Sequence, residues 1–336
     1  MKSIILKFKS FFEKQLLLCG AIQLCCIPLG ASEPNSTSGT PSNCTIINDV
    51  EYAVVAGSPL LMTITIPTEK PRKPVPAIVF LHGGGWGGGE RKSMLGRSSL
   101  VSQNGYIGAC VTYRLVGQAP FPAQIQDVKR AIRYLRANAS KYSIDPDRIG
   151  VWGCSAGGHL AAMAGLTEDI AEFEGEGDNP GVSSAVQMVV DCYGPTDFET
   201  WGESIKKIAN DEQVLKLFGA GSAIKEKELE WEKNFSIQTD GNIVKFFSGN
   251  PNPDYKWGSP LSYVKAGKKY PPFLIVHGTQ DAWVPMQQSI FLANALADAG
   301  ANIEFLLKPS MGHDESKAFP QILDYIKKTF PIRGSK

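Results

Sequence analysis

The chain of 336 residues carries 34 Lys and Arg against 33 Asp and Glu, which gives a formal net charge of +1. A nearly neutral chain without a basic cluster in its folded part gives no electrostatic support for nucleic-acid binding. Hydrophobic residues at 43% and charged residues at 20% are ordinary values for a globular protein with a substantial core. The length suits one large α/β domain or two small ones.

Residues 1–32 have the layout of a secretory signal peptide. Lysines precede an apolar stretch at 16–29, and small residues follow it. The stretch is interrupted by Gln23 and is short for a membrane span, so we expect no stable span, with an uncleaved anchor as the alternative. The sequence therefore predicts a protein that is secreted or periplasmic after cleavage. A flexible leader rich in Ser, Thr and Pro is expected at 33–46.

Strand and helix patterns alternate along residues 47–332, which we interpret as one domain. Strands at 50–56 and 60–67 are expected to form an opening hairpin. Further strands are expected at 77–81, 106–115, 148–153, 186–193, 272–277 and 302–308. Helical spacing is found over 124–142, 155–166, 285–299 and 315–330. Repeated β-then-α units predict an α/β fold in which helices cover both faces of a mostly parallel sheet.

Residues 197–256 fit this alternation poorly. They hold amphipathic helical stretches, Trp201 and Trp231, and a Pro-, Asn- and Gly-rich end. We interpret them as a cap-like helical insertion over the carboxyl edge of the sheet, where ligands of open α/β sheets bind.

Four cysteines remain after the apolar N-terminal stretch: Cys44, Cys110, Cys154 and Cys192. Cys110 and Cys192 lie in apolar strand-like runs, which favours buried free thiols. Four cysteines in a domain of this size do not make a disulfide scaffold, and their spacing does not resemble a zinc site. The sequence therefore gives no reason to expect a metal.

Two glycine-rich motifs follow predicted strands. The first is His82-Gly83-Gly84-Gly85-Trp86, and the second is Gly153-Cys154-Ser155-Ala156-Gly157. The second places a serine on a sharp strand-to-helix turn, and the first offers backbone N–H groups that no side chain shields from a developing oxyanion. A GxSxG pattern alone arises by chance in about one such chain in five, and HGGGW alone could be a plain turn. Together, in this order, they predict a serine hydrolase.

A serine nucleophile needs a base that is itself oriented by a third group, and the four histidines allow elimination. His82 is expected to hold the glycine loop. His159 lies one helical turn beyond Ser155 and should pack into the fold, and His277 ends a strand. His313 remains, in a turn between the last strand and the last helix, and is the predicted general base.

The third group should be a carboxylate on another loop at the carboxyl edge of the sheet. Asp281 directly follows a buried strand, and the order serine, aspartate, histidine is that of α/β-hydrolases. Asp191 and Asp197 are the alternatives, and Asp197 is the more credible because it also ends a strand. Asp314 is expected to be a surface or cap residue.

The oxyanion donors are predicted to be the N–H groups of Gly83, Gly84 and Ala156. Ala156 stands at a helix N-terminus, whose dipole favours negative charge.

Three aromatic residues adjoin the predicted site and are candidates for substrate contacts: Trp86, Tyr193 and Trp283. As single aromatics they could equally belong to the core. Arg114 is expected to pair with a carboxylate and steady its loop, and Asp127 lies on the helix that follows.

These residues resemble the α/β-hydrolase superfamily, in particular secreted bacterial esterases of the acetylxylan and feruloyl esterase kind and their hormone-sensitive-lipase-like relatives. HGGGW, DPDRIGVWGCSAGGHLA, DCYGPTD, FLIVHGTQDAWVP and GHD occur in the family's order, over roughly 50–330. The resemblance implies an eight-stranded sheet and a triad of Ser155, Asp281 and His313. It also implies a glycine oxyanion hole, no cofactor and hydrolysis of carboxylic esters.

The substrate implied by this resemblance is an ester, first of all acetyl or feruloyl groups on polysaccharide. A lipase-like short-chain carboxylesterase is the nearest alternative, and a prolyl-peptidase-like hydrolase is more remote. A non-catalytic binding protein of this fold usually lacks a triad residue, whereas all three are present here.

Overall fold

The computed structural model describes residues 44–69, 71–168, 170–177, 179–200, 246–247, 254–281 and 283–332. The predicted signal peptide, most of the predicted leader and most of the predicted 197–256 insertion lie outside these residues. Strand β1 (Cys44–Val55) begins before residue 47, so the domain starts slightly earlier than the composition suggests. No described helix is long and apolar enough to cross a membrane.

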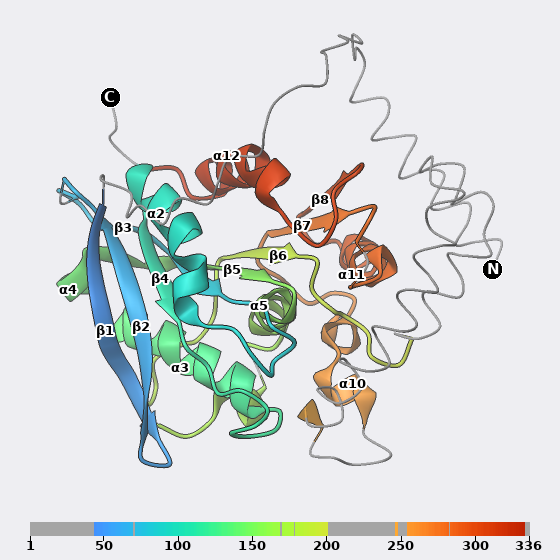
Figure 1. Ribbon diagram of the computed structural model, residues 1–336, viewed down its shortest axis with the longest axis horizontal. Helices are drawn as coiled ribbons and strands as arrows, with labels where there is room; N and C mark the ends of the chain where they lie inside the picture. The colour runs from blue at the N-terminus through green and yellow to red at the C-terminus, as the bar shows by residue number, and fades with distance from the viewer. Residues whose placement is uncertain are drawn as a thin grey trace, which may run out of the picture. The chain divides into compact units, whose positions relative to one another are not determined.

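The described residues contain one eight-stranded sheet with the order β1-β2-β4-β3-β5-β6-β7-β8 (Figure 1). The strands after β1 are β2 (Ser58–Pro67), β3 (Val75–Leu81), β4 (Ile107–Val111), β5 (Ile144–Cys154), β6 (Met188–Cys192), β7 (Phe273–Gly278) and β8 (Ile303–Lys308). The β1–β2 and β2–β4 pairs are antiparallel, and all others are parallel. The predicted fold class is confirmed.

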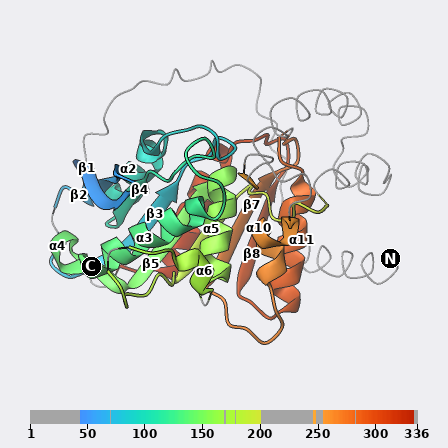
Figure 2. The same ribbon diagram turned by 90° about the horizontal axis from the view of Figure 1, so that it is seen from below.

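Helices cover both faces of this sheet (Figures 1 and 2). One face carries α2 (Leu95–Gln103) and α12 (Phe319–Thr329), and the other carries α3 (Ala123–Ala137), α5 (Ala156–Leu166) and α11 (Met286–Asp298). The short helices are η1 (Arg91–Met94), α4 (Ala139–Tyr142), α6 (Ala171–Glu174), α10 (Tyr255–Gly258), η2 (Pro260–Tyr263) and η3 (Ser316–Ala318).

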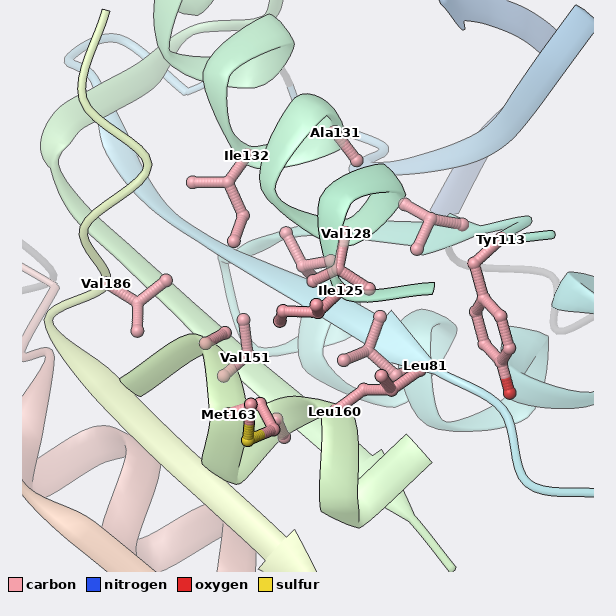
Figure 3. Close-up of a cluster of buried hydrophobic side chains, with 14 of the residues drawn as sticks. Leu81, Tyr113, Ile125, Val128, Ala131, Ile132, Val151, Leu160, Met163 and Val186 are labelled. Carbon is pink, nitrogen blue, oxygen red and sulfur yellow. The ribbon is translucent and has the colours of Figure 1, made fainter. Parts of the chain in front are cut away.

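Strand β3 shows how one sheet supports two cores. Its side chains alternate, so that Ala77, Val79 and Leu81 join the cluster under α3 and α5, whereas Ile78 and Phe80 join the cluster under α2 and α12. Figure 3 shows the first cluster, where helix residues pack on Leu81 of β3 and Val151 of β5. A strand buried on both faces needs a continuous apolar run, which is the pattern that identified it.

Some boundaries differ from the sequence prediction for local reasons. The helix predicted over 124–142 is interrupted at Asn138, whose side-chain amide donates to the carbonyl of Tyr134 at 2.9 Å. The strand predicted at 148–153 begins earlier, because β5 starts at Ile144 and its register against β3 shifts between Ile144 and Ile149. An irregularity of this kind accommodates extra residues without ending the strand.

Helix α2 was not predicted because serines, instead of an apolar stripe, make up much of its buried face. Ser98 and Ser102 are fully buried, and their hydroxyl groups lie 2.6 Å and 2.7 Å from Oγ1 of Thr65 on β2. Gly108 of β4 lets the helix approach this closely, since a Cβ there would lie 2.1 Å from Oγ of Ser98.

This packing predicts opposite effects of two glycine-to-alanine changes. Gly108→Ala should lower the free energy of unfolding by about 1–3 kcal/mol, because the added methyl overlaps Ser98. Gly96→Ala on α2 meets open space and should raise it by up to about 1 kcal/mol through helix propensity. Urea unfolding of both variants measures the difference, and equal effects would contradict the close packing of α2 on β4.

Candidate active site

Ser155 stands on a sharp turn between β5 and α5. Its backbone has φ 56° and ψ −122°, a conformation that non-glycine residues rarely adopt. Gly153 and Gly157 make the turn possible, because a Cβ on Gly153 would lie 1.9 Å from the carbonyl oxygen of Gly157, and one on Gly157 would lie 2.1 Å from that of Leu81. The turn therefore presents the serine hydroxyl at the carboxyl end of the central strand.

His313 and Asp281 come together from the two loops that follow β8 and β7. Nδ1 of His313 donates to Oδ2 of Asp281 at 2.8 Å, which leaves Nε2 as the nitrogen that can accept a proton from serine. His313 and Ser155 line the same cavity. The structure thus brings together the predicted nucleophile, base and acid.

The acid is held by its own loop and by a second histidine. Oδ1 of Asp281 accepts from the backbone N–H groups of Trp283 at 2.8 Å and Val284 at 2.9 Å. Nε2 of His277 donates to the carbonyl of Val284 at 2.9 Å and lies 3.4 Å from Oδ2 of Asp281. Burial raises the pKa of Asp281, but hydrogen bonds from His277 and His313 outweigh it and hold that pKa well below its ordinary value. The carboxylate therefore stays ionised beside the imidazole.

The alternative carboxylates are engaged elsewhere. Asp197 accepts from the backbone of Glu199 at 3.1 Å and from the hydroxyl of Thr200 at 2.6 Å. Asp191 accepts from the backbone of Gly194 at 2.9 Å. Asp314 accepts from Ser316 in the next turn, as expected of a cap residue.

The other histidines hold neighbouring backbone and side chains. Nδ1 of His82 donates to the carbonyl of Gly83 at 2.8 Å, so it fastens the glycine loop. His159 accepts from Nε1 of Trp86 at 3.2 Å, and its Nε2 donates to the carbonyl of Gly258 at 2.7 Å. The predicted Arg114 ion pair is also present as a two-pronged contact with Asp127, at 2.8 Å and 2.9 Å.

The glycine loop lies directly against the nucleophile. A Cβ on Gly83 would be 3.0 Å from the carbonyl oxygen of Cys154 and 3.1 Å from Cβ of Ser155, so a larger residue would require the turn to shift by a few tenths of an ångström. Gly84 has φ +116°, and its carbonyl accepts from the N–H groups of Gly87 and Gly88 at 3.1 Å and 3.0 Å. Gly83, Gly84 and Ala156 line the cavity together with Ser155, which is where donors to an oxyanion are required.

The cavity measures about 540 Å³ and lies within the range of small-molecule sites. Met94, Pro195, Val284 and Trp283 supply apolar lining, and Arg97 supplies a cation. Among the described residues, no group of three or more His, Cys, Asp or Glu side chains could hold a metal ion. The arrangement is suited to attack by a serine hydroxyl on the carbonyl of a small acyl group.

A family described as BD-FAE matches residues 62–296. The chain belongs to the BD-FAE family. Esterases LipC and LipQ of Mycobacterium tuberculosis are 29% and 30% identical to it over 250 and 271 residues. These matches cover 73% and 79% of this chain but 54% and 56% of the relatives, so the chain spans about half of their length. A solved structure described as a truncated form of a carbohydrate esterase from gut microbiota is 27% identical. It aligns with a TM-score of 0.69, covering 86% of this chain and 97% of that one.

In this BD-FAE family member, the three aromatic residues predicted to contact the substrate differ in their exposure and in their contacts. Trp86 borders the cavity, but it is only 2% exposed and its indole N–H donates a hydrogen bond to His159. Tyr193 is buried with its ring centre 4.4 Å from that of His313. Trp283 is 50% exposed and its ring lies 6.5 Å from that of His313, so it is the most exposed of the three residues, all of which line the cavity.

Two charged residues of the site were missed. Glu315 is fully buried and forms an ion pair with Arg97, which lines the cavity. In the sequence Glu315 stands only at the start of a predicted amphipathic helix. Its partner is 218 residues away, and no motif links the two.

The acid assignment predicts a large difference between two aspartate variants. Asp281→Asn should lower kcat for p-nitrophenyl acetate by about 10⁴-fold, because an amide neither fixes the required tautomer of His313 nor stabilises its protonated form. Asp197→Asn should keep most activity, because that carboxylate bonds only within its own turn. The reverse result would assign the acid to Asp197.

Because His159 is buried, we predict that the free energy of unfolding falls in acid. Burial lowers the pKa of His159 to about 4, despite the bond to Gly258. The unfolded chain takes up the proton near pH 6.5, so the free energy of unfolding should fall by about 3 kcal/mol between pH 6.5 and 4 through this residue. Asp191 acts in the opposite direction, because burial raises its pKa to about 6 and the folded state keeps its proton longer.

The two effects are separated by comparing the protein with its His159→Gln variant at each pH. Glutamine can keep an acceptor for Trp86 and a donor for Gly258 without titrating. The stability advantage of histidine over glutamine should shrink by about 3 kcal/mol from pH 7 to pH 4. A pH-independent difference in urea unfolding would show that His159 does not cause acid sensitivity.

Proposed function

We propose that this protein is a serine carboxylesterase that works through an acyl-enzyme. The observation that carries the proposal is the hydrogen bond from His313 to Asp281 beside a cavity that also holds Ser155 on its strained turn. Membership of the BD-FAE family and the esterase names of LipC and LipQ support the same activity.

In the proposed reaction, Oγ of Ser155 attacks the ester carbonyl while Nε2 of His313 takes its proton. The electron pair of the carbonyl moves onto its oxygen, which faces the N–H groups of Gly83, Gly84 and Ala156. The tetrahedral intermediate then collapses, the C–O bond to the alcohol breaks, and His313 protonates the leaving oxygen. Water activated by His313 releases the acid in the second half.

We further propose that the substrate carries acetyl or feruloyl groups on a polysaccharide. The half-exposed Trp283 at the rim offers a flat apolar surface on which the face of a sugar can pack. The structural relative described as a carbohydrate esterase supports this class. The apolar lining from Met94, Pro195 and Val284 favours the second candidate, a lipase-like short-chain carboxylesterase.

We also propose that the protein is exported and that residues 1–32 are removed. The support is the order of lysines, apolar stretch and small residues. Intact-mass measurement of the exported protein tests this directly. A species lacking about 32 residues supports cleavage, whereas the full mass in the membrane fraction supports an uncleaved anchor.

The substrate proposal predicts acetate release from acetylated xylan and turnover of p-nitrophenyl acetate, both lost in Ser155→Ala. Trp283→Ala should lower kcat/KM for the acetylated polymer about 3–10-fold more than for the small ester, because only a sugar reaches the rim. Hydrolysis of the small ester alone would retain the esterase and redirect the search to feruloyl, lipid or other small esters. No serine-dependent turnover of any ester would refute the activity.

A further inference from the structure

We propose that Glu315 is a positioning residue for the catalytic base. It forms, with Arg97 and Tyr193, a group that we call the Glu315 brace, which holds the ring of Tyr193 beside the imidazole of His313. The inference rests on the proposed function in one respect, namely that His313 is the base that activates Ser155.

Glu315 is a buried carboxylate close to His313 in the sequence. Its side chain has no exposed surface, although it follows His313 by only two positions in a loop at the cavity. A buried carboxylate is costly unless its oxygens are paired and hydrogen-bonded. Oε1 accepts from Nε of Arg97, and Oε2 accepts from the hydroxyl of Tyr193, so each oxygen has its own donor. These two hydrogen bonds, from distant parts of the chain, fix the position of the Glu315 side chain.

Tyr193 connects Glu315 with the imidazole of His313. Tyr193 directly follows β6, and its ring centre lies 4.4 Å from that of His313 with the planes inclined by 52°. The residue has φ +46°, an unfavourable value for a bulky side chain, and its N–H donates to the carbonyl of Val276 at 2.7 Å. Burial raises the pKa of Tyr193, and the neighbouring Glu315 adds to this, so its hydroxyl remains the donor.

Arg97 connects Glu315 with α2 and with the lining of the cavity. Arg97 lies on α2, lines the cavity, and also donates to the carbonyl of Ser93 at 3.3 Å. Its guanidinium carbon lies 5.5 Å from the ring centre of Phe319, the first residue of α12. The brace therefore joins α2, the end of β6 and the His313 loop, three elements that are far apart in sequence and meet at the cavity.

In catalysis, the brace acts by limiting rotation of the His313 imidazole. The bond from Nδ1 to Asp281 fixes one end of the imidazole but still permits rotation about that bond. The Tyr193 ring blocks this rotation on one face, and Glu315 keeps the tyrosine in place. A shift of about 1 Å in a reacting group can cost about 10²-fold in rate. Loss of the brace should therefore reduce kcat and leave substrate affinity nearly unchanged.

The test uses Glu315→Gln, Tyr193→Phe and the double variant with p-nitrophenyl acetate. Glu304→Gln is the matched control, because Glu304 forms an exposed surface pair with Lys328 at 2.6 Å. We expect Glu315→Gln to lower kcat about 10–100-fold and to change KM less than twofold. Tyr193→Phe should lower kcat less. The double variant should be no worse than Glu315→Gln, because the residues act as one unit.

A second readout is the rate at which a serine-reactive phosphonate labels Ser155, which also requires a correctly placed His313. It should fall in the same order as kcat, so the brace can be tested even if the protein hydrolyses no ester and the proposed function fails. A kcat and labelling rate within twofold of the parent in folded Glu315→Gln, or strictly additive losses in the double variant, would overturn the proposal. If Glu315→Gln does not fold, an unchanged rate in Tyr193→Phe overturns it, and a reduced rate supports it.

Discussion

The approach of α5 to the end of β3 is the contact on which the rest of the site depends. A Cβ on Gly157 would lie 2.1 Å from the carbonyl oxygen of Leu81 and 2.6 Å from that of His82. Leu81 of β3 is paired with Gly153 of β5, so the glycine loop and the serine turn leave neighbouring strands at the same level. The distance between Ser155 and the predicted oxyanion donors is thus set by strand register and by backbone contact.

Close backbone packing at a glycine also joins the loops that hold Asp281 and His313. A Cβ on Gly278, at the end of β7, would lie 2.0 Å from the carbonyl oxygen of Met311 and 2.5 Å from that of Gly312. The N–H of Gln280 donates to the carbonyl of Met311 at 2.9 Å, so the two loops are joined by backbone just before His313. Because β6 lies between β5 and β7, the residue that follows it, Tyr193, occupies the space between the serine turn and the histidine. Parallel strand order thereby explains why this tyrosine is the neighbour of the base.

Features whose signals lie within a few residues could be predicted from the sequence. Features that depend on contacts between distant residues could not. Strand β3 and the serine turn have signals within a few residues, namely a continuous apolar run and obligatory glycines, and elimination among four histidines sufficed to select His313. Helix α2 had no such signal because its buried serines interrupt any apolar period. Glu315 had none because burial of a carboxylate is decided by donors that only the fold brings to it. Trp86, a candidate for substrate contact, borders the cavity, but its burial and the hydrogen bond from its indole N–H to His159 also depend on contacts that only the fold provides.

Trp86 and His159 connect the glycine loop to the chain that follows residue 256. Trp86 has φ +56°, and its carbonyl accepts from the N–H of Val116 at 2.9 Å, so its backbone is fixed while its ring reaches His159. Nε2 of His159 in turn donates a hydrogen bond to the carbonyl of Gly258 in α10 (Tyr255–Gly258). The ring of Phe246 lies 4.8 Å from that of Trp86 and 5.6 Å from that of His159. A neutral, fully buried histidine can serve both partners because one nitrogen accepts and the other donates. Packed rings and two hydrogen bonds therefore connect the glycine loop with α10 and with Phe246.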